Sequence, residues 1–428
     1  MFLKKNNLLI YMTLAFILLS FIIPTFSFAI SDESIYVWSN NSNSISTSIS
    51  PSTSEQNASL SEEQSGNFLG ITSGSAILVE QNSGTILYEY NSHEQLRPAS
   101  VTKVMTILLI MEALDNGTIS LEDQVPCSEK ASSMGGSQIW LDTTETLSVN
   151  EMLKAICVVS ANDCCVAMAE YLSGSEELFV EQMNKRAKEL GMNDTCFKNC
   201  HGIDADGHLT SSYDIALMSR ELITKHPKIM DYTTIWMDSL RDGKSELVNT
   251  NKLIRNYEGA TGLKTGSTST ALFNLSATAT RNNLSLIAVI MRGETSAIRF
   301  AEAKKLLDYG FSNFEYVECS KKDDIVKSIA VDKGITNSVD AIFSSIQGCL
   351  IKKGTSKSIT TNISLPDKVS APIAKGQKLG EVTFVLDGKN IATVDIVAKE
   401  NVKKISFVNM SVRIVESWFK LLRVGLNC

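Results

Sequence analysis

The chain has 428 residues, of which 43% are hydrophobic and 20% are charged, and its formal net charge at pH 7 is −7. This negative balance, with no basic stripe in the body of the chain, argues against a nucleic-acid partner. The length exceeds what one small domain needs, so we expect two domains. Nine cysteines are too scattered for a disulfide framework, and their odd number leaves at least one thiol unpaired.

The N-terminus predicts export across the cytoplasmic membrane. Lys4 and Lys5 precede an apolar run from Leu8 to Ile23, and Ser27-Phe28-Ala29 supplies small residues at the positions of a cleavage site. This organisation is that of a secretory signal peptide over residues 1–29. An uncleaved membrane anchor is the alternative interpretation.

A polar stretch follows over residues 30–66. It is rich in Ser, Asn, Thr and Glu and contains few large apolar side chains. Such a segment cannot bury enough apolar surface to offset the entropy lost on ordering, so we predict a disordered linker.

Residues 67–310 carry both strand and helix signals and predict an α+β domain. Strand-like runs or hairpins are expected at Gly74–Tyr90, Ala271–Arg281 and Leu284–Arg292, and an amphipathic helix is expected at Ala297–Tyr309. Hairpin-linked strands at both ends of the domain favour an antiparallel sheet flanked by helices.

One short pattern in this domain suggests chemistry. Ser100-Val101-Thr102-Lys103 follows Pro98 and opens an apolar helix, on which residues three apart share a face. The Ser100 hydroxyl and the Lys103 amine can therefore meet. A desolvated lysine amine can take the proton of a serine hydroxyl and make it a nucleophile. Alone the pattern is weak, because a surface Ser and Lys on a helix are common.

The C-terminal third predicts a small β-rich domain and a terminal helix. Residues 311–406 consist of short β-type runs separated by turns and show no catalytic constellation. Residues 407–428 place polar side chains at spacings of 3 and 4, in the order Arg413, Glu416, Lys420, Arg423 and Asn427. A narrow, mostly basic face opposite Trp and Phe is typical of an amphipathic helix that lies in a membrane interface. The alternative is a helix docked on the β-rich domain.

Three short motifs stand in a fixed order along the chain: Ser100-x-x-Lys103, Ser160-x-Asn162 and Lys264-Thr265-Gly266. This set occurs in penicillin-binding proteins and class A β-lactamases. The chain resembles the low-molecular-mass penicillin-binding proteins of the serine-type D-alanyl-D-alanine carboxypeptidase family, over roughly residues 74–310 and more loosely beyond. The resemblance implies a helix-flanked sheet, a following β-rich domain and a membrane-associated C-terminal helix.

The resemblance also implies roles for the motif residues. Ser100 would attack the carbonyl between the two D-alanines of a peptidoglycan stem peptide and form an acyl-enzyme. Lys103 would act as the base, Ser160 would relay a proton to the leaving amine, and Asn162 would position Lys103 and the substrate. The terminal D-alanine would then leave, as a step in cell wall biogenesis, and β-lactam antibiotics would act as inhibitors.

Substrate-binding residues follow from the same resemblance. The backbone N–H groups of Ser100 and Ser267 would bind the oxyanion. Lys264 and Thr265 of the third motif, which Gly266 completes, would bind the terminal carboxylate together with Arg299. For Arg299, a simple surface position on its helix is an equal alternative.

Two alternative functions remain open at this point. A class A-like β-lactamase would use a Glu in an E-x-x-L-N setting, which is missing between Asn162 and Lys264. A non-catalytic wall-binding protein at the membrane would explain the linker and terminal helix but not the three motifs. Cys196 and Cys200 lack the partners of a zinc site, and neither a metal nor a cofactor is expected. The second motif carries Ala161 where this family most often has Gly.

Overall fold

The computed structural model describes residues 67–424. The predicted signal peptide (1–29), the predicted linker (30–66) and the last four residues of the predicted terminal helix lie outside the described residues. These three expectations therefore stay predictions.

The first domain is built on a five-stranded sheet in which all neighbouring strands are antiparallel. Its strands are β1 (Ser75–Glu80), β2 (Ile86–Tyr90), β7 (Ala260–Thr268), β8 (Leu272–Arg281) and β9 (Leu284–Gly293). They lie side by side in the order β2-β1-β9-β8-β7. The β8–β9 hairpin turns at Asn282 and Asn283, whose φ angles of 48° and 66° match a two-residue hairpin loop. The predicted antiparallel sheet is confirmed.

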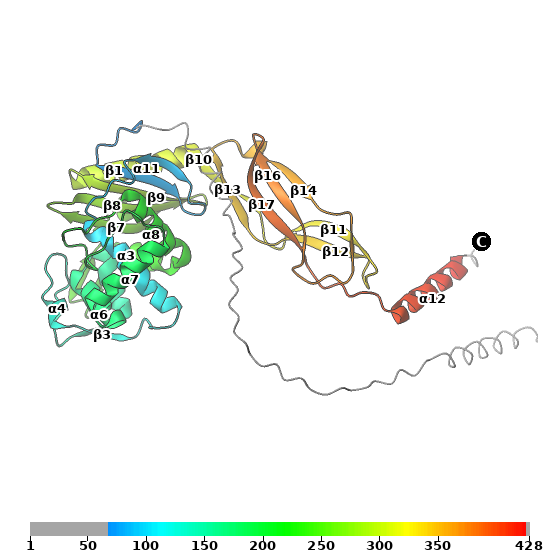
Figure 1. Cartoon of the computed structure of the whole chain (residues 1–428), viewed down its shortest axis with the longest axis horizontal. Coiled ribbons are helices and arrows are strands. Elements are labelled where there is room, and N and C mark those ends of the chain that lie inside the picture. Colours follow the sequence, from blue (N-terminus) through cyan, green and yellow to red (C-terminus); the bar gives the residue numbers. More distant parts are fainter. Residues whose placement is uncertain (1–66, 425–428) are drawn as a thin grey trace, which may run out of the picture. The chain divides into compact units, whose positions relative to one another are not determined.

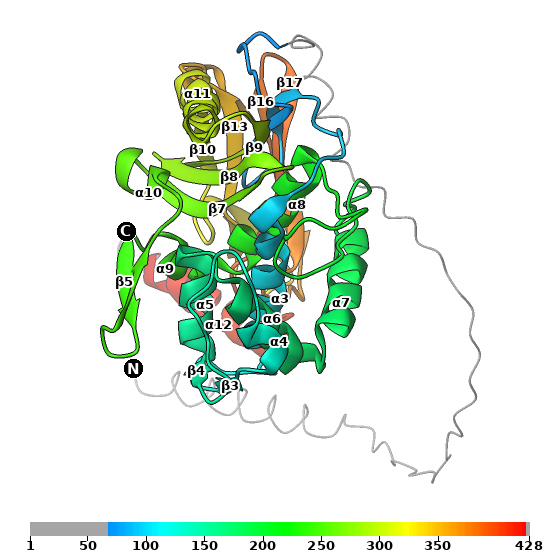
Figure 2. The same cartoon turned by 90° about the vertical axis from the view of Figure 1, so that its left-hand side faces the viewer.

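Helices cover both faces of this sheet. Three long helices pack on it, namely α11 (Ser296–Asn313), α3 (Lys103–Asp115) and α8 (Ser212–Lys225), and two short helices contact the edge strand β7. Successive side chains of a strand point to opposite faces. In β9, Leu286 and Ala288 therefore join an apolar cluster with α11, whereas Ile287 and Val289 join a cluster with α3 and α8. Figures 1 and 2 show α11 on one side of the sheet and α3 and α8 on the other.

A second group of helices packs around the buried helix α3. The elements of this group and of the loops near it are η1 (Ala99–Thr102), α4 (Glu129–Ser132), α5 (Val149–Val158), α6 (Asn162–Ser173), α7 (Glu176–Glu189), η2 (Pro227–Ile229), α9 (Met230–Thr233) and α10 (Leu253–Asn256). Two short hairpins lie beside them, β3 (Gln124–Pro126) with β4 (Thr146–Ser148) and β5 (Met237–Leu240) with β6 (Ser245–Val248). Ser148 and Glu151 form a capping box that starts α5.

The end of α11 differs from the sequence prediction. We expected the helix to end at Tyr309 and the catalytic domain at residue 310, but α11 continues to Asn313. The physical reason is Phe311, which is buried and still packs into the apolar cluster between α11 and the sheet. A helix that keeps burying apolar surface is not ended by one glycine.

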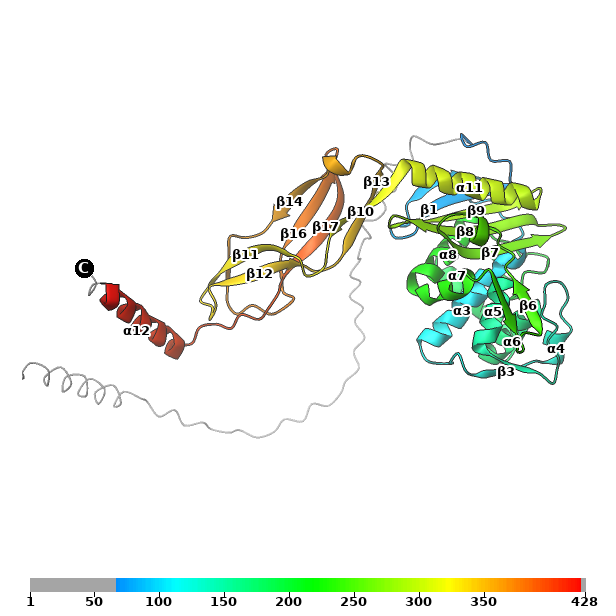
Figure 3. The same ribbon diagram turned by 180° about the vertical axis from the view of Figure 1, so that it is seen from behind.

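The second domain is β-rich, as predicted. Strands β10 (Phe314–Ser320) and β13 (Gln347–Lys352) form an antiparallel pair. A six-stranded sheet has the order β14-β16-β17-β12-β11-β15, with strands β11 (Ile325–Asp332), β12 (Ser338–Phe343), β14 (Thr360–Ser364), β15 (Lys368–Ser370), β16 (Lys378–Leu386) and β17 (Lys389–Ala398), and a single turn η3 (Ser356–Ser358) precedes β14. Figure 3 shows these strands from the side on which β11 and β12 are visible.

The last described element is the helix α12 (Phe407–Val424). Its existence confirms the predicted terminal helix as far as residue 424. Among the residues that the structure describes, no helix is both long enough and apolar enough to cross a membrane.

Candidate active site

Ser100 lies in the tight turn η1, directly before α3. Two hydrogen bonds brace this turn from inside the domain. The Thr102 hydroxyl donates to the carbonyl oxygen of Ala99 (2.8 Å), and it lies 2.8 Å from Nε2 of His208. Because Nδ1 of His208 accepts from the backbone N–H of Lys198 (3.0 Å), the ring proton sits on Nε2 and is donated to Thr102. Burial lowers the pKa of His208 to about 4, which keeps this neutral arrangement at physiological pH.

Lys103 is fully buried at the start of α3 and reaches three oxygen atoms. Its Nζ lies 2.9 Å from Oγ of Ser100, 2.6 Å from Oδ1 of Asn162 and 2.6 Å from the carbonyl oxygen of His201. None of these partners is a carboxylate, and burial lowers the pKa of the Lys103 amine below its usual range. The site therefore favours the neutral amine.

The partners of Lys103 also determine where its lone pair points. A neutral amine has two N–H donors and one lone pair. The Asn162 amide oxygen and the His201 carbonyl oxygen can only accept, so they take both N–H groups. The lone pair is then left for the third partner, the Ser100 hydroxyl, which can donate. This is the geometry that a base needs to deprotonate Ser100.

Ser160 and Asn162 occupy the break between α5 and α6. Ser160 has a left-handed φ of 67°, and among the described residues its buried Oγ has no hydrogen-bond partner. Asn162 donates through Nδ2 to the carbonyl oxygen of Gly135 (2.7 Å) and through its backbone N–H to that of Ser137 (2.7 Å). Ala161 has a φ of −59°, so no glycine is needed at this position.

The third motif lies on the edge strand β7. Lys264 is buried, and its Nζ donates to the carbonyl oxygen of Thr265 (3.0 Å). Burial lowers the pKa of Lys264 to about 7, and positive charge on Lys103 contributes to this whenever that amine is protonated. The Thr265 hydroxyl donates to that of Thr250 (2.8 Å). The two lysines thus sit close enough to influence each other, and neither amine has a carboxylate among its hydrogen-bond partners in the described part of the chain.

Gly266 lets β7 approach the turn that carries Ser100. A Cβ added to Gly266 would lie 2.8 Å from the Pro98 carbonyl oxygen and the Val101 nitrogen, and 2.9 Å from the Ser100 nitrogen. No side chain fits at such distances, so only glycine permits the observed contact. The next residue, Ser267, is exposed on the same strand.

Arg299 lies behind β7 and is largely buried. Its Nη1 donates to the carbonyl oxygens of Gly266 (3.0 Å) and Asn274 (3.2 Å), and the guanidinium lies over the rings of Phe273 and Phe300. Burial lowers the pKa of Arg299 to about 10. The surface alternative considered from the sequence is wrong, because the side chain supports the third motif from inside. Its contact with a substrate carboxylate stays a prediction.

No role could be assigned from the sequence to the main-chain carbonyl of His201 or to Gly202, although both belong to a segment after α7 that resembles the family. The carbonyl oxygen of His201 accepts a bond from Lys103, and Glu176 lies 3.4 Å from Nε2 of His201. Gly202 has a φ of +92°, and an added Cβ there would lie 2.0 Å from the carbonyl oxygen of Ala99. A main-chain carbonyl has no signature in a sequence, so only a neighbouring glycine hints at this contact.

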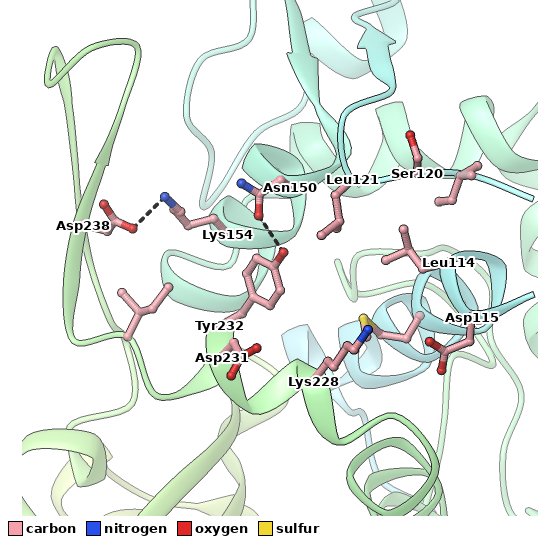
Figure 4. Close-up of a pocket in the computed structure, with 13 residues that line it drawn as sticks. Leu114, Asp115, Ser120, Leu121, Asn150, Lys154, Lys228, Asp231, Tyr232 and Asp238 are labelled. Carbon is pink, nitrogen blue, oxygen red and sulfur yellow. Dashed lines mark hydrogen bonds and ion pairs between the residues drawn. The ribbon is translucent and has the colours of Figure 1, made fainter. Parts of the chain in front are cut away.

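A separate hollow lies at the opposite end of α3 from Ser100. It has a volume of about 570 Å³ and is lined by Met111, Leu114, Asp115, Ile119, Ser120, Leu121, Asn150, Lys154, Lys228, Asp231, Tyr232, Ile235 and Asp238. Figure 4 shows that polar groups in it bind one another. Lys154 pairs with Asp238 (2.7 Å), and the Tyr232 hydroxyl donates to Asn150 (2.6 Å). None of the predicted site residues lines this hollow, so it is distinct from the candidate active site. Within residues 67–424, no group of His, Cys, Asp or Glu side chains could hold a metal ion.

The fold and this site are those of a serine enzyme of the penicillin-recognising class. Residues 59–295 match the model of the D-alanyl-D-alanine carboxypeptidase family, peptidase S11, and residues 314–404 match that of the C-terminal domain of penicillin-binding protein 5. The chain therefore belongs to the D-alanyl-D-alanine carboxypeptidase family. It is a serine-type peptidase, which confirms the activity expected from the three motifs.

Individual relatives agree with this assignment over most of the chain. The D-alanyl-D-alanine carboxypeptidase DacF of Bacillus subtilis is 45% identical over 350 residues, which cover 81% of this chain and 90% of DacF. DacC of Escherichia coli is 34% identical over 77% of this chain and 84% of its own length. The crystal structure of penicillin-binding protein 5 from Haemophilus influenzae superposes with a TM-score of 0.66 at 34% identity, covering 78% of this chain and 98% of that one.

Proposed function

We propose that this carboxypeptidase removes the terminal D-alanine of peptidoglycan stem peptides through an ester on Ser100. One observation carries the proposal: Lys103 Nζ lies 2.9 Å from the Ser100 hydroxyl, while its two other partners can only accept hydrogen bonds. The neutral amine therefore takes the Ser100 proton as Oγ attacks the carbonyl carbon of the penultimate D-alanine.

The second half of acylation needs a proton for the leaving amine. Ser160 is the candidate relay, because its buried hydroxyl has no partner among the described residues and sits two residues before Asn162. It would donate its proton to the nitrogen of the terminal D-alanine as the C–N bond breaks. Lys103, by then protonated, would restore the proton of Ser160. Water then attacks the ester carbonyl and gives up a proton through the same groups, and Ser100 recovers its proton as the ester bond breaks and the peptide leaves.

The oxyanion and the substrate carboxylate would bind on the two sides of Gly266. The Ser100 nitrogen lies close to Gly266, and we take the N–H groups of Ser100 and of Ser267, the residue that follows Gly266, as the oxyanion donors. Lys264 and Thr265 would bind the terminal carboxylate. A buried lysine whose pKa has fallen to about 7 gains from an anion, because the carboxylate offsets the desolvation of its charge.

β-Lactams are expected to acylate the same serine. Penicillin-binding protein D2 of Listeria monocytogenes has been crystallised in an ampicillin-bound form, and it matches this chain with a TM-score of 0.52 at 30% identity, over 56% of this chain and 98% of that one. We infer that penicillin forms a long-lived ester with Ser100 here, since no E-x-x-L-N run is present between the second and third motifs to supply a deacylating base.

Mass spectrometry of the purified protein tests these roles. Incubation with penicillin should add the mass of one antibiotic molecule to a peptide that contains Ser100, and a pentapeptide ending in D-Ala-D-Ala should release D-alanine. Ser100→Ala should abolish both. Rapid penicillin turnover without an adduct would favour the β-lactamase alternative, and equal D-alanine release by wild type and variant would favour a non-catalytic role for the site.

We further propose that the mature chain is exported and attached to the outer face of the membrane through α12. The large apolar side chains of α12 that the structure describes are exposed, namely Phe407, Val408, Met410, Val412, Ile414, Val415 and Trp418. Together with the basic residues spaced along its other side, they suit a membrane interface. The full chain should sediment with vesicles containing anionic lipid, and a chain ending at residue 406 should not. Equal sedimentation of both would contradict the attachment.

A further inference from the structure

Two cysteines face each other at the start of the β-rich domain. Cys319 lies on β10 and Cys349 on β13, and their Sγ atoms are 2.7 Å apart. The antiparallel register places Val317 opposite Cys349, and Val317, Cys319 and Cys349 all belong to the apolar cluster of the β-rich domain, so the two cysteines point to the same side. The register slips between Glu318 and Ser320, which is where Cys319 lies. A bulge of this kind re-aims a side chain, and here it brings Cys319 to its diagonal neighbour.

These two thiols differ from the cysteines of the catalytic domain. Cys157, Cys164 and Cys165 are buried in the apolar core around α3, and burial raises their pKa. Cys319 is only half-buried, and its pKa is lowered because the Cys349 thiol can donate a hydrogen bond to it. The pair therefore combines an accessible sulfur that ionises more readily with a buried sulfur in contact with it. This is the arrangement of an attacking and a resolving cysteine.

We propose that Cys319 and Cys349 form an intramolecular disulfide that ties β10 to β13. The oxidant is a disulfide, either a small molecule such as oxidised glutathione or the active-site disulfide of a thiol oxidoreductase. The Cys319 thiolate attacks one sulfur of the donor, the donor S–S bond breaks, and one donor thiol leaves. Cys349 then attacks the Cys319 sulfur and displaces the second donor thiol. Two electrons pass to the donor, and the two protons lost by the cysteines end on its thiols.

The bond would close a loop at the connection between the two domains. Strand β10 begins at the residue after α11 ends, and Tyr316 of β10 and Leu350 of β13 pack against the apolar cluster beneath α11. Residues 319 and 349 enclose β11 and β12, so the cross-link restricts this whole segment in the unfolded chain. The proposed disulfide rests on the proposed export in one respect: export would place the chain in an oxidising compartment, where disulfides persist.

The experiment uses the full-length protein, oxidised with glutathione disulfide or reduced with dithiothreitol. Each sample is denatured, alkylated with iodoacetamide, digested and analysed by mass spectrometry. The oxidised sample should contain Cys319 and Cys349 peptides joined and lighter by two hydrogens, whereas Cys196, which is also half-buried, should be alkylated in both samples. Alkylation of Cys319 and Cys349 in the oxidised sample, or glutathione retained on Cys319 with Cys349 alkylated, overturns the proposal.

Thermal unfolding supplies the second readout. Oxidation should raise the melting temperature of the wild type by about 5–15 °C. The shift should vanish in Cys319→Ser and persist in the control Cys196→Ser. Because the wild type is compared with itself, a variant that fails to fold does not weaken the test. An unchanged wild-type melting temperature contradicts the inferred stabilisation. D-alanine release measured on the same samples reports separately on the proposed function.

Discussion

Replacing Gly266 by alanine should separate the nucleophile from its oxyanion site without changing a polar group. The added Cβ would lie 2.8 Å from the Pro98 carbonyl oxygen and the Val101 nitrogen, whereas ordinary contacts begin near 3.4 Å. All the nearest atoms belong to the backbone, so no side chain can rotate away. The turn η1 and strand β7 must move apart by about 0.6 Å or more, which the close packing of the domain resists.

The expected loss in kcat follows from the group that lies at the contact between η1 and β7. The Ser100 nitrogen lies 2.9 Å from the position of the new Cβ, so the displacement acts on a proposed oxyanion donor. Loss of one such donor costs about 10²–10³ in kcat, or about 3–4 kcal/mol of transition-state stabilisation. Overpacking also destabilises a fold by about 1–3 kcal/mol, which a domain of this size can tolerate. We therefore expect a folded Gly266→Ala protein with kcat for D-alanine release reduced at least ~100-fold.

Gly135→Ala is the matched control for this substitution. Gly135 also belongs to the site, because its carbonyl oxygen accepts a bond from Asn162. An added Cβ there would meet no atom within 4 Å, and its φ is not left-handed. D-alanine release and the rate of penicillin acylation should stay near wild type in the control and fall together in Gly266→Ala. The steric argument would be refuted if Gly266→Ala folded and kept activity within about threefold of wild type, because loss of an oxyanion donor should lower kcat far more than that.

Three further outcomes are expected. Lys103→Arg should fold but form no penicillin adduct, because arginine cannot shed its proton; an adduct seen by mass spectrometry would exclude Lys103 as the base. Free-enzyme kcat/KM should fall above pH 7 as Lys264, whose pKa is about 7, loses its charge, and Lys264→Arg should remove this alkaline limb; a limb that persists would assign it to another group. The pKa of His208 is lowered from 6.5 to about 4 in the folded protein. As pH falls between these two values, the unfolded chain therefore binds a proton at His208 before the folded protein does. The free energy of unfolding should then fall by about 1.4 kcal/mol per pH unit. In urea titrations His208→Asn should flatten that slope, and equal slopes in the variant and the wild type would contradict the assignment.

The side chains of the active site could be predicted because the residue types and spacing of the three motifs indicate their chemistry. Ser100, Lys103, Asn162 and Lys264 come from a turn, two helices and a strand, yet the order of their motifs was enough to expect them together. The structure joins the first three directly, with Lys103 bonded to Ser100 and Asn162. The antiparallel sheet could also be predicted from the sequence, since the residue types at Asn282-Asn283 indicate the turn of one hairpin.

What the sequence could not supply are contacts made by groups that every residue possesses. The His201 carbonyl directs the lone pair of Lys103, but any residue at that position would offer the same oxygen. For Arg299 the sequence left a carboxylate-binding role and a surface position as equal alternatives, because its bonds go to the backbone of Gly266 and Asn274, which no side-chain pattern reports. The end of α11 was missed for a similar reason, since the burial of Phe311 depends on tertiary packing.

The position of the nucleophile is therefore set by residues without side chains as much as by its chemical partners. A Cβ added to Gly266 of β7 would lie 2.8 Å from the Val101 nitrogen and 2.9 Å from the Ser100 nitrogen, and one added to Gly202 would lie 2.0 Å from the carbonyl oxygen of Ala99. A methyl group at either glycine would collide with the backbone of the same turn. Because the backbone atoms closest to both glycines belong to the turn that carries Ser100, the 2.9 Å distance between Ser100 and Lys103 depends on this close packing as well as on their own hydrogen bond. This explains why the serine can be held ready for attack while its base remains neutral, without a carboxylate to orient either group.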